Sequence, residues 1–476
     1  MAKSSLSKKA KKQGAQLAKM LISFVGSKTF FVLAIAWFFI QAVYIAFSTE
    51  TGIPPDENYH IALINFFSDS GWTPYIQSQE GFFKLGEVIN NPFTIYHYLL
   101  SIPNSIFGGD LSVFALRFMN ILMAVGSLFV VDQIGKVLKL SKIARNLSVF
   151  MIANTLMFTF LAASVNYDNL FILVFLISLL QLLKLWNKIQ LNDVLTLILA
   201  VLVGSLTKES FLAVAVSVGA LLFFRHVRDT PKILKKLSRQ KRNFATYVLA
   251  VFCVIIGFYA VSKYVPNAVN YGTYIPSCQE VNSLDECLAN PIIARDQGFA
   301  EAGSPEPVLS VYQYVSNWFS LMVDRTYGVF GHQSFASLPI IYYGVLAIGA
   351  VGTIGFIRYI DKKRAFAFTA LGVVAFYTVL LINQNMNAYE STGISSISVQ
   401  GRYVLPVLAL LYLLWTQFSL RMLRTKIRGA IYIVLILSLF SISGVYTYIV
   451  STDPTWHPDR ADGINESLRS RLPDRE

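Results

Sequence analysis

The chain has 476 residues, of which 54% are hydrophobic and only 14% are charged. Soluble domains carry roughly a quarter of charged residues, so this composition excludes an ordinary soluble protein and indicates a polytopic membrane protein. The net charge of +13 would suit a nucleic-acid-binding protein. We exclude that class because the basic residues gather in the connections that one side of a membrane would hold.

The amino-terminal segment, residues 1–28, carries seven lysines, among them Lys8 and Lys9. Basic segments beside a first span stay in the cytoplasm and are attracted to anionic lipid. We therefore predict a basic cytoplasmic tail. The apolar run at 30–47 is long and lacks a small-residue cleavage site, which predicts a retained helix rather than a cleaved signal peptide.

Long apolar runs recur along the chain. An α-helix needs about 20 apolar residues to cross the hydrocarbon core, whereas a transmembrane barrel would show short alternating segments, which are absent. We predict an all-α polytopic protein of about 11 transmembrane helices, with a membrane domain at 29–450 and a polar extracytoplasmic tail at 451–476. The predicted spans are 30–47, 113–134, 144–164, 168–185, 192–206, 209–224, 244–263, 338–357, 365–383, 402–419 and 429–449.

The segment 92–107 is apolar but short, and Pro103 interrupts it. If it crossed, every later connection would change sides, and the Lys- and Arg-rich connections would no longer lie in the cytoplasm. We therefore predict an interfacial or re-entrant helix, which leaves two large outer loops, 48–112 and 264–337. The aromatic-rich stretch 311–330 is suited to the headgroup layer, either as an anchor or as part of the wall of a site.

Three cysteines are present. Cys278 and Cys287 flank a short polar segment of the second outer loop, where disulfides persist, and we predict that they pair; the alternative is two free loop thiols. Cys253 lies within an apolar run and is predicted to be a small buried thiol. No Cys-x-x-Cys or Cys/His cluster indicates a zinc site.

The stretch at 53–60 follows the first span and contains two prolines followed by Asp56 and Glu57. Proline and acidic residues are typical of a helix start. The position at the outer mouth of a membrane protein favours a second role, in which Asp56 is a catalytic base and Glu57 belongs to the catalytic group. His60 lies one turn beyond Asp56, on the same predicted helix face, and is predicted to orient the carboxylate or to contact substrate; a packing histidine is the alternative.

The predicted outer face is net acidic, so basic residues there are informative. Lys208 lies at a tight outer turn, Arg402 begins a late span within Gln400-Gly401-Arg402-Tyr403, and Arg117 begins an earlier span. A charge near the membrane must pair, extend to water or bind a ligand. We predict that Lys208 and Arg402 bind substrate, together with Gln400 and Tyr403. A structural role is as good an interpretation for Arg117.

Asp168 is predicted either to cap the helix that begins there or to be a second catalytic carboxylate. His332 is a weaker candidate. Carboxylates can take a proton from a hydroxyl while Arg and Lys stabilise a departing phosphate, and this chemistry needs no nucleotide signature. The hypothesis requires Asp56, Asp168, Lys208 and Arg402 to lie within about 15 Å of one another, because one substrate must reach all four.

Several motifs together resemble a known family of bacterial membrane proteins, domain of unknown function 2142. The resemblance runs from residue 53 to about 406, and the chain departs from the family pattern at Asn58, Tyr59 and Asn91. The motifs are Pro-Pro-Asp-Glu-x-x-His at 54–60, Asn-Pro-x-x-x-Tyr at 91–96, Leu-Arg-Phe-x-Asn at 116–120, Asn-x-Asp at 166–168 and Gln-Gly-Arg-Tyr at 400–403.

That family is similar to the GT-C superfamily of membrane glycosyltransferases, which use polyprenyl-phosphate sugars and place an acidic motif in the first outer loop. The resemblance implies that Asp56 is the catalytic acidic position and Asp168 a second acidic site, and that Lys208 and Arg402 hold the lipid phosphate. It further implies a bacterial plasma-membrane enzyme that transfers a sugar, with inversion, to an extracytoplasmic cell-wall or surface glycan. A divalent cation such as Mg²⁺ or Mn²⁺ is compatible with this reaction but not required by it.

Three alternatives stay open at this point. A transporter or flippase of lipid-linked glycans would place ionisable groups near mid-membrane, where the predicted spans have almost none. A non-catalytic scaffold of a surface-polysaccharide complex would tolerate replacement of Asp56. A ligase or polymerase that uses diphosphate-linked donors would differ only in its donor.

Overall fold

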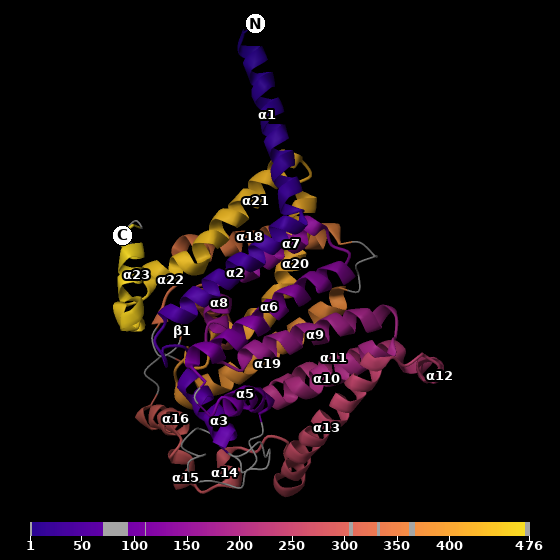
Figure 1. Cartoon of the computed structure of the whole chain (residues 1–476), viewed down its shortest axis with the longest axis vertical. Helices are drawn as coiled ribbons and strands as arrows, with labels where there is room; N and C mark the ends of the chain where they lie inside the picture. The colour runs from indigo at the N-terminus through magenta and orange to yellow at the C-terminus, as the bar shows by residue number, and fades with distance from the viewer. Residues whose placement is uncertain are drawn as a thin grey trace.

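The structure, a computed structural model, describes residues 2–69, 94–109, 111–303, 308–330, 334–360 and 367–471. Helices form nearly all of it (Figure 1). In the described residues the strands are limited to one short antiparallel pair, β1 (Val329–Phe330) with β2 (Ser334–Phe335). The sequence candidate His332 lies outside the described residues.

The helices of the first half, in chain order, are α1 (Ala2–Val25), α2 (Lys28–Ser48), α3 (Glu57–Asp69), α5 (Ile95–Ile106), α6 (Val113–Val137), α7 (Lys142–Ala153), α8 (Leu156–Ala162), α9 (Asp168–Asn187), α10 (Leu191–Thr207), α11 (Phe211–His226), η1 (Val227–Asp229) and α12 (Thr230–Ser238). Those of the second half are α13 (Phe244–Tyr271), α14 (Cys278–Val281), α15 (Leu284–Leu288), α16 (Pro291–Ala302), α17 (Val311–Tyr327), α18 (Pro339–Tyr359), α19 (Ala367–Thr392), η3 (Gly401–Val404), α20 (Leu405–Met422), α21 (Lys426–Ser441), η4 (Ile442–Tyr446), α22 (Thr447–Ser451), η5 (Pro454–Trp456) and α23 (Asp459–Arg469).

The all-α, polytopic class is confirmed. Nine helices in the described residues are long and apolar enough to cross a membrane, and each coincides with a predicted span. The two remaining predicted spans differ in form. The span at 144–164 is a pair of helices, α7 and α8, bent by 65°, and the span at 192–206 is α10, which has only 17 residues.

The bend between α7 and α8 is stabilised by side chains that take over the hydrogen bonds of the interrupted helix. Asn154 Nδ2 donates to the Phe150 carbonyl at 2.8 Å, and Thr155 Oγ1 donates to the Met151 carbonyl at 2.9 Å. Gln41 on α2 donates to Asn154 Oδ1 at 3.1 Å. A broken helix is tolerated at membrane depth only when its freed polar groups are paired in this way.

Two interfacial predictions have different outcomes. Helix α5 has 12 residues, about 18 Å at 1.5 Å per residue, so it is too short to cross a core about 30 Å thick, as predicted. The aromatic side chains of α17 were predicted either to anchor the loop in the headgroup layer or to form part of the wall of a site. Tyr314, Trp318 and Tyr327 are buried in the protein core, and only Tyr312 and Phe319 on the other face are exposed.

The predicted outer elements α3, α5 and α14–α16 gather at one end of the molecule, whereas α1 extends from the opposite end (Figure 1). Helices α14 and α15 are joined by a disulfide bond between Cys278 and Cys287, whose Cα atoms are 5.8 Å apart. Cys253 is partly buried rather than fully enclosed. Which end faces the cytoplasm, and the division into a tail at 1–28, a membrane domain at 29–450 and a tail at 451–476, remain predictions.

Candidate active site

Asp56 lies immediately before α3 rather than inside it. Its backbone has φ +61°, the left-handed region that costs a non-glycine residue roughly 1–2 kcal/mol, and its carbonyl accepts the amide of His60 at 3.0 Å. The carboxylate is 38% exposed and pairs with Arg402, with Asp56 Oδ2 2.6 Å from Nη2. Asp56 therefore occupies the position before the first turn of α3, and its carboxylate is directed to Arg402.

Glu57, the next residue, is fully buried and faces another partner. Its two carboxylate oxygens accept from Nε and Nη2 of Arg117 at 2.8 and 2.6 Å. They also accept the backbone amides of Val165 and Gly52, at 2.9 and 3.2 Å. The remaining Arg117 nitrogen, Nη1, donates to the carbonyls of Ala46 and Thr49 at the end of α2, both at 2.7 Å. We call Glu57 and Arg117 the clamp, because the pair joins the end of α2, α3, α6 and the segment before α9.

Asp168 is the first residue of α9, and its backbone amide is capped by the Asn166 side chain, whose Oδ1 lies 2.9 Å away. The Asp168 carboxylate does not cap the helix, so that alternative is wrong. It pairs instead with Lys208 Nζ at 2.8 Å through Oδ1 and with Arg402 Nε at 3.3 Å through Oδ2. Asn166 also donates from Nδ2 to the Pro55 carbonyl at 3.1 Å, so one side chain contacts both acidic segments.

Arg402 lies on η3 and is almost fully buried. Its position depends on a close approach of η3 to α17: a Cβ atom on Gly401 would lie 2.3 Å from the carbonyl carbon and oxygen of Arg325. Arg325 donates to the Ser396 carbonyl at 2.7 Å and also to the Val399 carbonyl. Because glycine has no side chain, residue 401 can pack against the backbone of Arg325, and this contact positions Arg402 at the site.

Lys208 follows α10 as its capping residue, and its ammonium is surrounded by aromatic rings. Nζ lies 4.3 Å from the centroid of the Tyr403 ring and 4.9 Å from that of Tyr167. Cation–π contacts of this kind hold a charge in an apolar setting. Tyr403 is thus near the site through its ring, while its carbonyl accepts the Tyr377 hydroxyl at 3.1 Å.

The structure brings together the four charged residues on which the sequence hypothesis depended. Asp56, Arg402, Asp168 and Lys208 form a continuous chain of ion pairs with separations of 2.6, 3.3 and 2.8 Å. We call them the quartet. Its formal charge is zero, and its exposure falls from Asp56, the most accessible side chain, to Arg402 and Asp168, which are buried.

His60 is buried beside the quartet but does not orient Asp56. Its Nδ1 lies 2.8 Å from His97 Nε2, and His97 Nδ1 contacts the Thr94 hydroxyl. His97 was missed by sequence analysis, because a single histidine in an interfacial helix carries no signal of its own. The indication available was its place directly after Tyr96 of the Asn-Pro-x-x-x-Tyr motif.

Several buried polar atoms around the quartet make no hydrogen bond to any residue that the structure describes. They are His60 Nε2, Gln400 Oε1, Asp168 Oδ2, and both Nε and Nη1 of Arg402. Buried polar groups are nearly always paired in folded proteins, and an unpaired one costs about 1–3 kcal/mol. Water or the polar groups of a ligand at this place would supply the missing partners.

The two carboxylates of the quartet do not by themselves make a site for a divalent cation. Within the described ranges, no group of three or more His, Cys, Asp or Glu side chains is arranged to hold a metal ion. Mg²⁺ and Ca²⁺ need several oxygen ligands, whereas the two carboxylates here already face Arg402 and Lys208. We derive no step through a metal.

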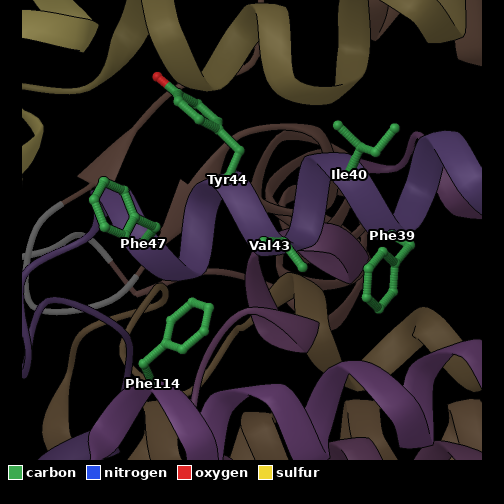
Figure 2. A pocket seen from close by; sticks show the side chains of 6 residues that line it. All are labelled: Phe39, Ile40, Val43, Tyr44, Phe47 and Phe114. Atoms are coloured by element: carbon green, nitrogen blue, oxygen red, sulfur yellow. The ribbon is translucent and has the colours of Figure 1, made fainter.

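An apolar groove lies beside α2 (Figure 2). Phe39, Ile40, Val43, Tyr44 and Phe47 of α2 line it, with Phe114 of α6 on the opposite wall. Arg117, three residues after Phe114, points into the protein to Glu57. None of the lining residues belongs to the quartet or the clamp, and the apolar lining suits the bilayer.

Comparisons with known proteins give no family assignment: no known family model and no curated protein matches the chain. Among solved structures, the apo oligosaccharyltransferase of Archaeoglobus fulgidus aligns with 94% of this chain at 12% identity and a TM-score of 0.46. The complex of AglB from the same organism with an inhibitory peptide and a dolichol-phosphate aligns with 94% at 14% identity and a TM-score of 0.45. The chain spans 60% of the length of each. ArnT from Cupriavidus metallidurans bound to undecaprenyl phosphate aligns with 82% of this chain and 78% of its own, at 13% identity and a TM-score of 0.37. Membership in the family of domain of unknown function 2142 remains a prediction.

Proposed function

We propose that the chain is a GT-C-type glycosyltransferase of the bacterial plasma membrane. It moves one sugar from a polyprenyl-phosphate donor to a cell-wall or surface glycan on the outer side, with its amino terminus in the cytoplasm and its carboxy terminus outside. The observation that carries the proposal is the quartet. It joins two carboxylates and two cations from distant parts of the chain. Within it, Arg402 Nη1 makes no hydrogen bond to a described residue and can donate to a ligand.

In the proposed reaction Asp56 is the base, because its carboxylate is the most accessible member of the quartet. Asp56 takes the proton of the acceptor hydroxyl, and the oxygen attacks the anomeric carbon of the donor. The bond from that carbon to the phosphate oxygen breaks, and its electron pair leaves with the phosphate. A single displacement inverts the anomeric centre.

Arg402 and Lys208 would bind the phosphate. Arg402 Nη2 donates to Asp56, and Nε faces Asp168 at 3.3 Å without a hydrogen bond. We assign Nη1 to a phosphate oxygen, because it makes no hydrogen bond to a described residue. Lys208 has three N–H donors, one of which faces Asp168. Cations already fixed in place stabilise developing negative charge without reorganising. Asp168, as their common partner, holds both cations in position.

Glu57 receives a different role from the one expected for it. The sequence grouped it with Asp56 as a catalytic residue, but both its oxygens accept hydrogen bonds in the buried clamp. We assign it to positioning Asp56. Gln400, His60 and Tyr403 stay in the substrate-binding set, since each contributes an atom or a ring next to the quartet.

Two of the matched structures were solved with a lipid phosphate, dolichol-phosphate in one and undecaprenyl phosphate in the other. The donor class proposed here is of the same kind. Because these likenesses are distant, the proposal rests on the residues of the quartet.

The test is transfer from a panel of radiolabelled polyprenyl-phosphate sugars in membranes that contain the wild-type chain, Asp56→Asn or a control, Asp285→Asn, at matched expression. Asp285 is an exposed carboxylate on α15. We expect transfer from one donor, lost by about 100-fold or more in Asp56→Asn and unchanged in the control. Transfer that survives Asp56→Asn, or that is absent with every donor, contradicts the proposal. Movement of an intact lipid-linked glycan across the membrane would instead support a transporter.

A further inference from the structure

His60 and His97 form a buried pair joined edge to edge. Their rings are nearly coplanar, with an interplanar angle of 24°, centroids 5.1 Å apart and a nitrogen–nitrogen distance of 2.8 Å. This is the geometry of an N–H···N hydrogen bond in the plane of both rings. Both side chains are essentially inaccessible, so water does not compete for this bond.

The pair is neutral. Burial lowers the pKa of His97 to about 3. Burial also lowers the pKa of His60 well below its usual value, and the nearby His97, Arg402 and Lys208 lower it further. A neutral imidazole has one nitrogen that donates and one that accepts. The hydrogen bonds from Thr94 through His97 to His60 must therefore all run in one direction or all in the other.

These two arrangements determine what His60 offers to the site. If the Thr94 hydroxyl donates to His97, then His97 donates to His60, and Nε2 of His60 is a donor. If Thr94 accepts, every bond reverses and Nε2 is an acceptor. Nε2 is the one ring nitrogen of the pair without a hydrogen bond to a described residue. A ligand group that both donates and accepts, a hydroxyl, fits either arrangement.

The pair lies next to the quartet. The Tyr167 ring is 4.7 Å from the His60 ring, and the Lys208 ammonium is 4.9 Å from the same Tyr167 ring. Tyr167 directly precedes Asp168 in the chain. A molecule whose phosphate contacts Lys208 and Arg402 would therefore bring its neighbouring groups toward Nε2.

We propose that Nε2 of His60 binds a hydroxyl group of a sugar, and that His97 is a positioning residue, held by Thr94, that fixes whether this nitrogen donates or accepts. The inference deepens the proposed function and rests on it. The hydroxyl belongs either to the transferred sugar or to the acceptor glycan, and the experiment separates the two.

The first arm compares wild type with His97→Leu and His97→Gln. Leucine leaves Nδ1 of His60 unpaired, whereas glutamine can still hydrogen-bond to it. We expect His97→Leu to raise one KM by about tenfold, the effect of one disrupted buried hydrogen bond, with a smaller change in kcat, and His97→Gln to restore most of it. A raised KM for the donor assigns the hydroxyl to the transferred sugar, and a raised KM for the acceptor assigns it to the glycan. Unchanged KM values in folded His97→Leu overturn the inference and leave the proposed function standing.

The second arm does not need turnover. The chain has five histidines, so ¹⁵N-histidine NMR of the full chain in bilayers can be assigned with His60→Gln and His97→Gln. At pH 7 we expect both residues to give neutral imidazole signals, and the His60 Nε2 signal to shift when undecaprenyl phosphate and a panel of methyl hexopyranosides are added together. A charged imidazole or an unmoved Nε2 signal overturns the inference, whatever the transfer assay shows.

Discussion

Asp56 and Glu57 are adjacent, have the same functional group and lie within a few ångströms of arginines, yet they occupy opposite settings. Glu57 is fully buried, and each oxygen accepts two hydrogen bonds. Asp56 is partly exposed, in a strained backbone conformation, and shares its arginine with Asp168. Every polar atom of the Glu57 carboxylate is paired within the clamp. Several polar atoms in and around the quartet make no hydrogen bond to a described residue.

Hydrogen-bond pairing distinguishes the two arginines, Arg117 of the clamp and Arg402 of the quartet, better than burial does. Arg117 and Arg402 are both almost inaccessible. The three side-chain nitrogens of Arg117 all donate within the protein. In the part of the chain that the structure describes, neither Nε nor Nη1 of Arg402 makes a hydrogen bond. Strain and unmet hydrogen bonds persist where the surrounding structure supports them, which is typical of binding sites.

The largest effect on stability is expected when the ion pair of the clamp is broken. Glu57→Gln keeps the shape of the side chain but leaves Arg117 as a buried uncompensated charge, which should lower the free energy of unfolding by about 3–5 kcal/mol. Thermal unfolding of the purified protein in detergent measures the change, with Asp285→Asn as the matched control. A melting temperature equal to that of wild type would contradict a structural role for Glu57.

The second prediction concerns the quartet and replaces its buried arginine. Arg402→Lys keeps the positive charge but loses the fork of donors that reaches two carboxylates and a third group. We expect the donor KM to rise by roughly 10- to 100-fold, which corresponds to about 1.4–2.7 kcal/mol, with a smaller change in melting temperature than for Glu57→Gln. Steady-state transfer kinetics test this. Equal donor KM values for Arg402→Lys and wild type would mean that Arg402 serves Asp56 and Asp168 alone.

The smallest expected effect is on the stability of the protein at acidic pH, through His97. The unfolded chain protonates His97 near pH 6.5, whereas burial holds the pKa in the folded protein at about 3. Between these values the unfolded state binds the extra proton, so stability falls as the pH falls, by about 1.4 kcal/mol per pH unit. Melting temperatures at pH 7 and pH 5 should therefore converge in part in His97→Gln. An identical acid sensitivity in wild type and variant would contradict the neutral buried pair.

Much of this arrangement is predictable from the sequence. The apolar runs locate the spans, because length and composition alone determine whether a helix can cross a bilayer. The charged residues at Asp56, Asp168, Lys208 and Arg402 stand out because charge is rare beside a membrane, and the structure joins all four.

The remainder depends on contacts between distant segments. Nothing local distinguishes Glu57 from Asp56, and the separation appears only when Arg117 arrives from α6. His97 acquires meaning from His60, 37 residues away. The bend at Asn154 also escapes prediction, because its apolar run is uninterrupted by proline or glycine and the bend is stabilised by Gln41 from α2.

The Asn166 side chain has a consequence for selectivity. Its amide group contacts the carbonyl before Asp56 with one end and the amide of Asp168 with the other. Because an amide group is planar and rigid, these two hydrogen bonds fix the distance between the two acidic segments. In the proposed reaction, a substrate whose hydroxyl and phosphate are spaced differently would have to distort these contacts. The neutral Asn166 side chain, which takes no part in the proposed chemistry, would then limit which molecules can react.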